Sequence, residues 1–166
     1  MSDKRVVAFG LLLLLDFVLS LVMLVTDKNL QTDFGVQSPY YLHWYGVLAM
    51  GVLDLVLGLS LLVSASGSTM QRMSSSVRRT GVMGALAWSV IAILAMLGIV
   101  TTYAQVGFSS MSQFAQYLFG VTAYPGALSY IPWLYDLLLV LYVVTAAAGA
   151  LASRRIAPTP ASPTAA

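Results

Sequence analysis

The sequence predicts an all-α integral membrane protein in which four transmembrane helices form one bundle. Of its 166 residues, 59% are hydrophobic and only 8% are charged, whereas a soluble domain carries about 25% charged residues. The chain also contains four long apolar runs. Each has about the 20 residues that an α-helix needs to cross the hydrocarbon core of a bilayer. We therefore expect a single membrane domain over residues 1–152.

The first apolar run predicts a transmembrane helix over residues 6–25. A signal peptide is the competing interpretation, but its apolar region spans only about 7–15 residues and ends in a small-residue cleavage site. Here the run is longer and ends in Met23-Leu24-Val25-Thr26-Asp27, which is a poor cleavage site. The second helix is predicted over residues 41–63, directly after Ser38-Pro39.

The third and fourth helices are predicted over residues 81–103 and 131–151. Residues 64–79 are rich in Ser and Gly, which is the composition of an exposed loop. Tyr124-Pro125-Gly126 predicts a turn before the fourth helix. Three prolines stand among Ala, Ser and Thr near the C-terminus, so we expect a disordered tail over residues 153–166.

A short amphipathic helix is predicted over residues 110–119, between the third and fourth transmembrane helices. Its apolar residues recur at i, i+3, i+4, i+7 and i+8, which places them on one helical face: Met111, Phe114, Ala115, Leu118 and Phe119. Ser110 and Gln113 have the spacing of a capping box, and Gly120 supplies a stop. We expect this helix to lie on the membrane surface.

The basic residues predict the orientation of the bundle. Seven of them fall on one side of the predicted spans, namely Lys4, Arg5, Arg72, Arg78, Arg79, Arg154 and Arg155, and only Lys28 falls on the other side. The positive-inside rule then places both termini in the cytoplasm, as expected for an even number of helices. We expect a multi-pass protein of the plasma membrane.

Aromatic residues gather on the opposite side. Fourteen of the eighteen lie in or beside the predicted outer segments, and the exceptions are Phe9, Phe17, Trp88 and Tyr142. An interfacial belt is one explanation, although such belts ordinarily flank both faces. A docking surface for a partner is the other. Its candidate contact residues are His43, Trp44, Tyr45, Phe114, Tyr117, Trp133 and Asp136.

Two aspartates lie deep inside the predicted spans. Counted at 1.5 Å per residue, Asp16 and Asp54 are roughly 14–15 Å from the same membrane boundary, and Ser89 and Tyr142 fall near that level. Asp136 is only about 8 Å below the opposite surface. A carboxyl group at mid-membrane depth is costly and needs a reason to be there.

This predicted layer of Asp16, Asp54, Ser89 and Tyr142 has two interpretations. In the first, neutral carboxyls hydrogen-bond to neighbouring helices and hold the bundle together. In the second, the pair binds protons or a cation on a transport route. A conducting route needs more polar residues above and below the layer, which favours helix packing.

The residues predict no catalytic group, metal site or cofactor. There is no cysteine and only one histidine. His43 with Met50, two turns below it, has the residue types for haem ligation, but a histidine beside Trp44 and Tyr45 is more typical of a headgroup contact. The net charge of +2 comes from the basic residues at the predicted cytoplasmic side, so it favours lipid headgroups over nucleic acid as partners.

These observations lead to a functional hypothesis. We expect a small non-catalytic subunit of a larger membrane complex, of a respiratory or redox type, with the lipid bilayer and other integral subunits as its partners. The alternative is a small proton- or cation-conducting protein, built as a homo-oligomer around Asp16 and Asp54. A quinone- or lipid-binding role for His43 ranks third. An enzyme acting alone is not expected.

Overall fold

A computed structural model describes residues 3–26, 41–66, 75–107 and 132–154. These segments form four long helices: α1 (Lys4–Thr26), α3 (Tyr41–Ala65), α5 (Ser75–Gly107) and α7 (Pro132–Ser153). Each contains an apolar stretch long enough to cross a membrane. The predicted all-helical fold with four candidate membrane spans is therefore confirmed for the described part of the chain.

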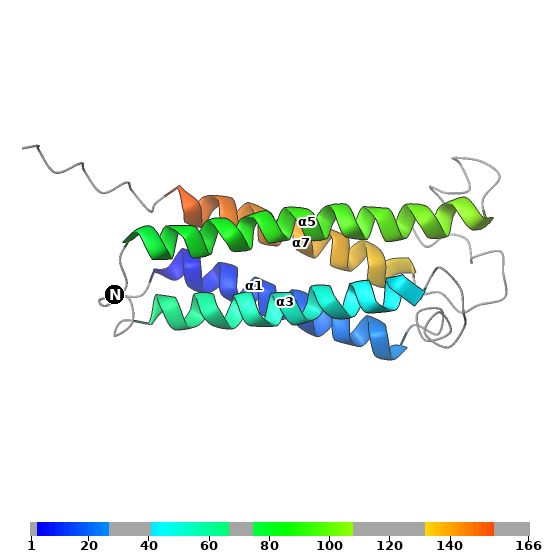
Figure 1. The fold of residues 1–166 in the computed structure, drawn as a ribbon, viewed down its shortest axis with the longest axis horizontal. Helices are drawn as coiled ribbons and strands as arrows, with labels where there is room; N and C mark the ends of the chain where they lie inside the picture. Colours follow the sequence, from blue (N-terminus) through cyan, green and yellow to red (C-terminus); the bar gives the residue numbers. More distant parts are fainter. Residues whose placement is uncertain (1–2, 27–40, 67–74, 108–131, 155–166) are drawn as a thin grey trace, which may run out of the picture.

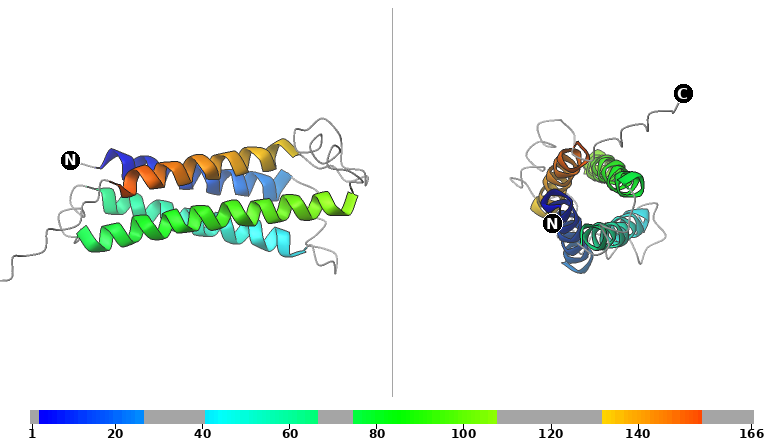
Figure 2. Two further views of the ribbon diagram at one scale, coloured as in Figure 1. Left: turned by 90° about the horizontal axis from the view of Figure 1, so that it is seen from above. Right: turned by 90° about the vertical axis from the view of Figure 1, so that its left-hand side faces the viewer.

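The four helices run side by side along one long axis, and successive helices run in opposite directions (Figure 1). Seen end-on, they stand around a common centre (Figure 2). α1 packs along both α3 and α7, and α5 packs along α7. The contact between α3 and α5 is much slighter, so α5 is held to the bundle mainly through α7.

The buried positions of each helix recur every three and then four residues. On α5 they are Val82, Ala85, Ser89, Ala92, Met96 and Ile99, and on α7 they are Tyr135, Leu138, Tyr142, Thr145, Gly149 and Ala152. On α1 they include Val6, Phe9, Leu13, Asp16, Ser20 and Met23. An average spacing of 3.5 residues is the pattern of a left-handed coiled coil, in which the same face of each helix stays turned to its partners.

The buried apolar side chains form two clusters. The first, which we call the far cluster, comprises Met23, Leu24, Val47, Met50, Ala92, Met96, Ile99, Leu134, Tyr135, Leu138 and Tyr142. The second, the basic-end cluster, comprises Val6, Phe9, Leu13, Leu61, Ala65, Val82, Ala85 and Ala152. The outward faces are apolar as well, with exposed residues such as Leu11, Leu59, Leu94 and Val140. Such a surface suits contact with lipid chains.

Glycines let α1 and α3 approach closely. A Cβ atom built on Gly58 would lie 2.9 Å from the backbone oxygen of Gly10, and one built on Gly10 would lie 3.0 Å from the backbone oxygen of Gly58. In both cases the added Cβ atom would contact a backbone oxygen. The contact could be relieved only by moving a whole helix, because a backbone atom cannot rotate away as a side chain can. Gly51 contacts Ser20 of α1 in the same interface. These small residues therefore set the α1–α3 distance.

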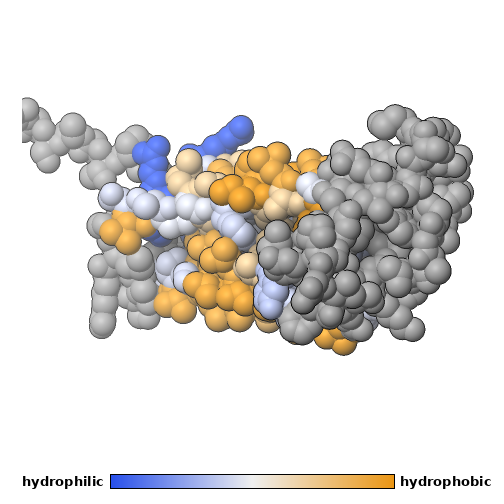
Figure 3. All heavy atoms as spheres, turned by 45° about the vertical axis from the view of Figure 1, so that its right-hand side comes forward, coloured by the Kyte–Doolittle hydropathy of each residue, from blue (hydrophilic) through white to orange (hydrophobic). Residues whose placement is uncertain are grey.

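The basic side chains of the described residues all lie at one end of the bundle. Lys4 and Arg5 begin α1, Arg78 and Arg79 lie near the start of α5, and Arg154 follows α7. We call this the basic end. Figure 3 shows the strongly hydrophilic side chains gathered toward it, while hydrophobic side chains cover much of the visible middle of the bundle. This separation is the pattern expected where headgroups meet one end of a membrane bundle.

Some helix boundaries differ from those predicted. α5 begins at Ser75 and ends at Gly107, rather than spanning residues 81–103. Residues 75–79, predicted as part of an exposed loop because residues 64–79 are rich in Ser and Gly, are thus helical. Hydrophobicity marks where a span meets water, but backbone hydrogen bonds continue the helix beyond that level. The predicted surface helix at 110–119 lies outside the described residues, as does the predicted tail apart from Ser153 and Arg154.

The glycine contact between α1 and α3 predicts a specific defect. Gly58→Ala should lower the free energy of unfolding by about 1–3 kcal/mol, because the added methyl group overpacks a backbone contact. Gly84→Ala is the matched control, since nothing lies within 4 Å of a Cβ atom there. Unfolding by denaturing detergent in mixed micelles measures both. Equal stability of the two variants would contradict the close approach.

Candidate functional site

A layer of buried polar side chains crosses the middle of the bundle. Its members are at most 1% exposed and come from all four helices: Asp16 and Ser20 from α1, Asp54 from α3, Ser89 from α5, and Tyr142 and Thr145 from α7. We call this set the polar layer. Each member occupies a buried position of its helix, so helix packing alone turns these groups toward one another.

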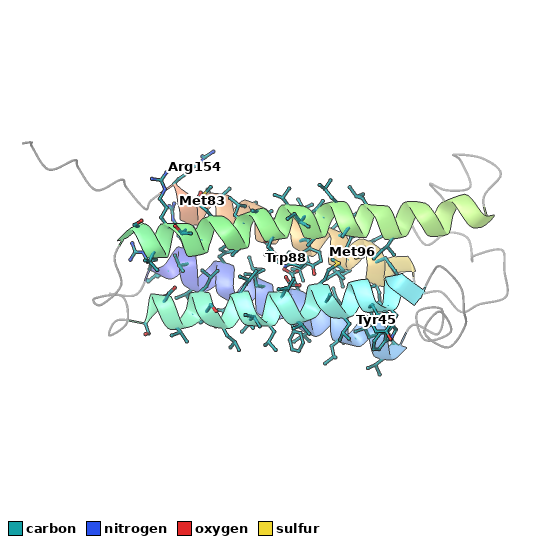
Figure 4. The ribbon with its side chains drawn as sticks, viewed as in Figure 1. Tyr45, Met83, Trp88, Met96 and Arg154 are labelled. Carbon is teal, nitrogen blue, oxygen red and sulfur yellow. The ribbon has the colours of Figure 1, made fainter. Side chains whose placement is uncertain are left out.

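Asp54 accepts two hydrogen bonds from two different helices. The Trp88 indole Nε1 of α5 donates to Asp54 Oδ1 at 2.7 Å. The Tyr142 hydroxyl of α7 donates to Asp54 Oδ2 at 2.5 Å. Figure 4 shows Trp88 extending from α5 into the interior of the bundle. Both carboxyl oxygens of Asp54 are thus satisfied by donors from outside its own helix.

Asp16 is less completely satisfied than Asp54. The Thr145 hydroxyl of α7 donates to Asp16 Oδ2 at 2.8 Å. Asp16 Oδ1 and Ser20 Oγ are buried and make no hydrogen bond of normal geometry to the residues that the structure describes, although Ser20 Oγ lies close to the Tyr142 hydroxyl. The two groups lie one turn apart on α1. The layer therefore has unused hydrogen-bonding capacity on its α1 side, where most buried polar atoms would be paired.

The two carboxyl groups lie in the same polar layer and would carry like charges if both were ionised. No basic side chain in the described segments can offset them, since all five lie at the basic end. Two ionised carboxylates in this low-dielectric interior would repel each other, and burial penalises charge on either one. A pair of this kind can hold a proton or accept hydrogen bonds. Both chemical roles predicted from the sequence are thus compatible with the geometry.

The hydrogen bonds of the carboxyl groups all cross between helices. Trp88 to Asp54 joins α5 to α3, and Tyr142 to Asp54 joins α7 to α3. Thr145 to Asp16 joins α7 to α1. Through two carboxyl groups, each helix is linked to at least one other. The Trp88 bond matters most for α5, because its direct packing against α3 is slight.

Sequence reasoning found part of the polar layer. It predicted the common level of Asp16, Asp54, Ser89 and Tyr142, and the structure places all four among the buried side chains. Ser89, however, donates to the Ala85 carbonyl oxygen of its own helix at 3.0 Å. It has no recorded bond to either carboxyl group in the described segments.

Two partners of the carboxyl groups were missed by sequence reasoning, Trp88 and Thr145. A signal existed for each. A tryptophan in the middle of a span carries an N–H that lipid cannot satisfy, so Trp88 requires an acceptor within the bundle. Thr145 follows Tyr142 by three residues, which puts it on the same buried face of α7.

Apolar side chains close the bundle on both sides of the polar layer. The far cluster lies on one side and the basic-end cluster on the other, and Trp88 packs against both. These apolar regions contain few polar side chains among the described residues. Near the basic-end cluster, the Ser64 hydroxyl donates to the backbone oxygen of Leu61 on its own helix. In the far cluster, Tyr135 is buried among apolar side chains. The described part of the bundle interior thus has a polar middle between two predominantly apolar halves.

The predicted partner-contact residues that the structure describes fall at the end opposite the basic end. Trp44 packs against the far cluster, and its ring meets that of Tyr45 edge-on, with centroids 5.4 Å apart. Tyr45 points outward, with 49% of its surface exposed. Asp136 is half-buried on α7. The side chains of His43 and Trp133 fall outside the described part of the structure, as do Phe114 and Tyr117 entirely.

Comparison with known proteins identifies no relative: no family model, curated protein or solved structure matches the chain. Within the described residues, no three His, Cys, Asp or Glu side chains are grouped as they would be around a metal ion. The chemistry of the site must therefore be argued from its own geometry.

The bond from Thr145 to Asp16 should contribute measurably to stability. Thr145→Val keeps the side-chain shape and removes the donor, so the free energy of unfolding should fall by roughly 0.6–2 kcal/mol. Thr26→Val is the matched control. Thr26 is exposed at the end of α1, and its hydroxyl donates to the backbone oxygen of Val22 on the same helix. Unfolding in mixed micelles compares the two. Wild-type stability of Thr145→Val would show that the bond adds nothing.

Proposed function

We propose that this protein is a small non-catalytic subunit that stabilises a larger membrane complex, with respiratory and other redox complexes as the first class to test. In this role the four helices form a rigid body that offers its surface to neighbouring subunits. The hydrogen bonds of the polar layer then act within the protein, where they keep the helices in register. It takes no direct part in chemistry.

One observation carries this proposal. The polar layer lies between two apolar clusters, and the hydrogen bonds of its two carboxyl groups run between helices, not along the bundle axis. A route for protons or ions needs polar groups or water on both sides of its central site. Packing of this kind supports a structural role for the carboxyl groups.

The far end supplies the surface through which we propose that other subunits bind. Tyr45 is exposed there, and Trp44 holds its ring edge-on. Aromatic side chains are enriched in protein interfaces because they bury a large area at small entropic cost. Tyr45 is accordingly the described residue with which to test partner binding.

A second candidate function is proton or cation conduction through an oligomer. It is favoured by two buried oxygens on α1, Asp16 Oδ1 and Ser20 Oγ, which make no hydrogen bond of normal geometry within the described segments. A water molecule or a cation could use these two oxygens. This candidate requires the apolar clusters to open during transport, which the structural role does not.

We propose that the protein lies in the plasma membrane with its basic end on the cytoplasmic side, in line with the positive-inside rule. The chain has no cysteine, so Ser66→Cys provides a single reactive thiol at the exposed end of α3. A membrane-impermeant maleimide should label it only after the cytoplasmic side is opened. Labelling in intact cells would show that the basic end faces outward and would contradict this orientation.

The subunit proposal is tested by the size of the native particle. Extraction of membranes in mild detergent should release the tagged chain in a large particle, with cofactor-bearing chains identified by mass spectrometry. Tyr45→Ala should release the chain from these companions, because it removes the exposed aromatic contact. Leu59→Ala, an exposed site elsewhere on the same helix, is the matched control and should leave the particle intact.

A chain that runs alone or as a small homo-oligomer would overturn the proposal. Proton flux in liposomes then decides the second candidate. Flux that Asp54→Asn abolishes, in a variant that still folds, would establish conduction. If the protein is a non-catalytic subunit, liposomes that contain the wild-type protein should pass protons no faster than liposomes of lipid alone. The Asp54→Asn variant should still be extracted together with the other chains of the complex.

A further inference from the structure

A groove of about 180 Å³ lies between α1 and α7 at the basic end. It is lined by Arg5 and Ala8 from α1 and by Ala148 and Leu151 from α7. The two alanines leave a hollow where larger side chains would fill the space between the helices. Ala8 and Leu151 are exposed, so the groove opens on the outer surface of the bundle. It is separate from the polar layer.

The Arg5 guanidinium is held beside this groove. Its Nη1 donates to the backbone oxygen of Leu151 at 3.3 Å, which satisfies one of the carbonyl groups left open at the end of α7. This is its one recorded side-chain hydrogen bond in the described segments. Since a guanidinium carries five N–H donors, Arg5 retains donors for an anionic group at the groove.

The charge around the groove is positive. Lys4 precedes Arg5 on α1, and Arg154 follows α7, and both are exposed. The nearest acidic residue in the sequence, Asp3, accepts a hydrogen bond from the backbone N–H of Arg5 and keeps its negative charge, but Lys4, Arg5 and Arg154 outnumber it. The groove therefore combines a cationic mouth with an apolar floor one helical turn deeper.

We propose that this groove binds one anionic phospholipid, whose phosphate group contacts Arg5 and whose acyl chain lies against Ala8, Ala148 and Leu151. The candidate span of α1 begins at Lys4, so Arg5 lies at headgroup level and Ala8 about 4.5 Å deeper. Basic pockets between helices at the cytoplasmic side of membrane proteins are suited to anionic headgroups. This lipid site goes beyond the subunit role and does not depend on it.

The groove chemistry favours a lipid over a soluble anion. Three of its four lining residues are apolar, and a free phosphate would gain nothing from them. A lipid satisfies both parts at once, with the phosphate at the guanidinium and a chain in the hollow. Arginine also matches phosphate oxygens in a bidentate fashion, whereas lysine acts as a point charge.

Native mass spectrometry of the protein titrated with phosphatidylglycerol tests the site. The wild type should retain one phosphatidylglycerol more tightly than phosphatidylcholine. Arg5→Gln should weaken that binding about fivefold, the effect of one basic group near an anionic membrane surface. Ala8→Leu should weaken it too, because the added side chain fills the groove while every charge remains. Ala8 is exposed, so this change leaves the core intact.

Arg79→Gln is the matched control. Arg79 is an exposed arginine at the same end of the bundle, but it lies on α5 and does not line the groove. The Arg79→Gln variant should bind phosphatidylglycerol as tightly as the wild type does. Equal losses in Arg5→Gln and Arg79→Gln would show general attraction of headgroups to the basic end and overturn the site. Unchanged binding in Ala8→Leu would do the same.

Discussion

The interhelical hydrogen bonds of the bundle follow from the burial of two carboxyl groups that have no basic partner among the described side chains. Lipid cannot satisfy Asp16 and Asp54 at the middle of the bundle, so the protein itself supplies donors, which reach three of the four carboxyl oxygens. It does so with Trp88 and Tyr142 for Asp54, and with Thr145 for Asp16. Each of these donors comes from another helix, which ties the register of the helices to the two carboxyl groups.

The packing differs between the helix pairs. α1 and α3 touch through glycines at Gly10 and Gly58, where backbone meets backbone. α5 makes little direct contact with α3, and there the Trp88 bond to Asp54 spans the interface. Small residues and polar bonds are the two means by which membrane helices associate, since apolar burial gives no preference for protein over lipid.

The sequence predicted the number and approximate location of the helices because their apolar runs are long and bear few charges. It could not predict which face of each helix is buried. In a soluble protein the exposed face is polar, but here residues such as Leu94 and Val140 face outward and are as apolar as the core. The spacing of 3.5 residues becomes visible only once burial is known.

The site was predictable to a similar extent. Counting residues along antiparallel helices placed Asp16 and Asp54 at one level, because helical rise is fixed. Counting gives depth but not rotation. For this reason Ser89 was grouped with the carboxyls although it bonds to Ala85 of its own helix, while Trp88, its neighbour in sequence, makes the contact across the bundle.

The polar layer holds the helices together through specific hydrogen bonds between them. A double-mutant cycle between Asp54→Leu and Tyr142→Phe tests this most directly, with the free energy of unfolding measured in mixed micelles. We expect the effects of the two substitutions to be coupled by roughly 0.6–2 kcal/mol, as for buried hydrogen bonds between membrane helices. Effects that add within about 0.3–0.5 kcal/mol, as independent sites do, would contradict it.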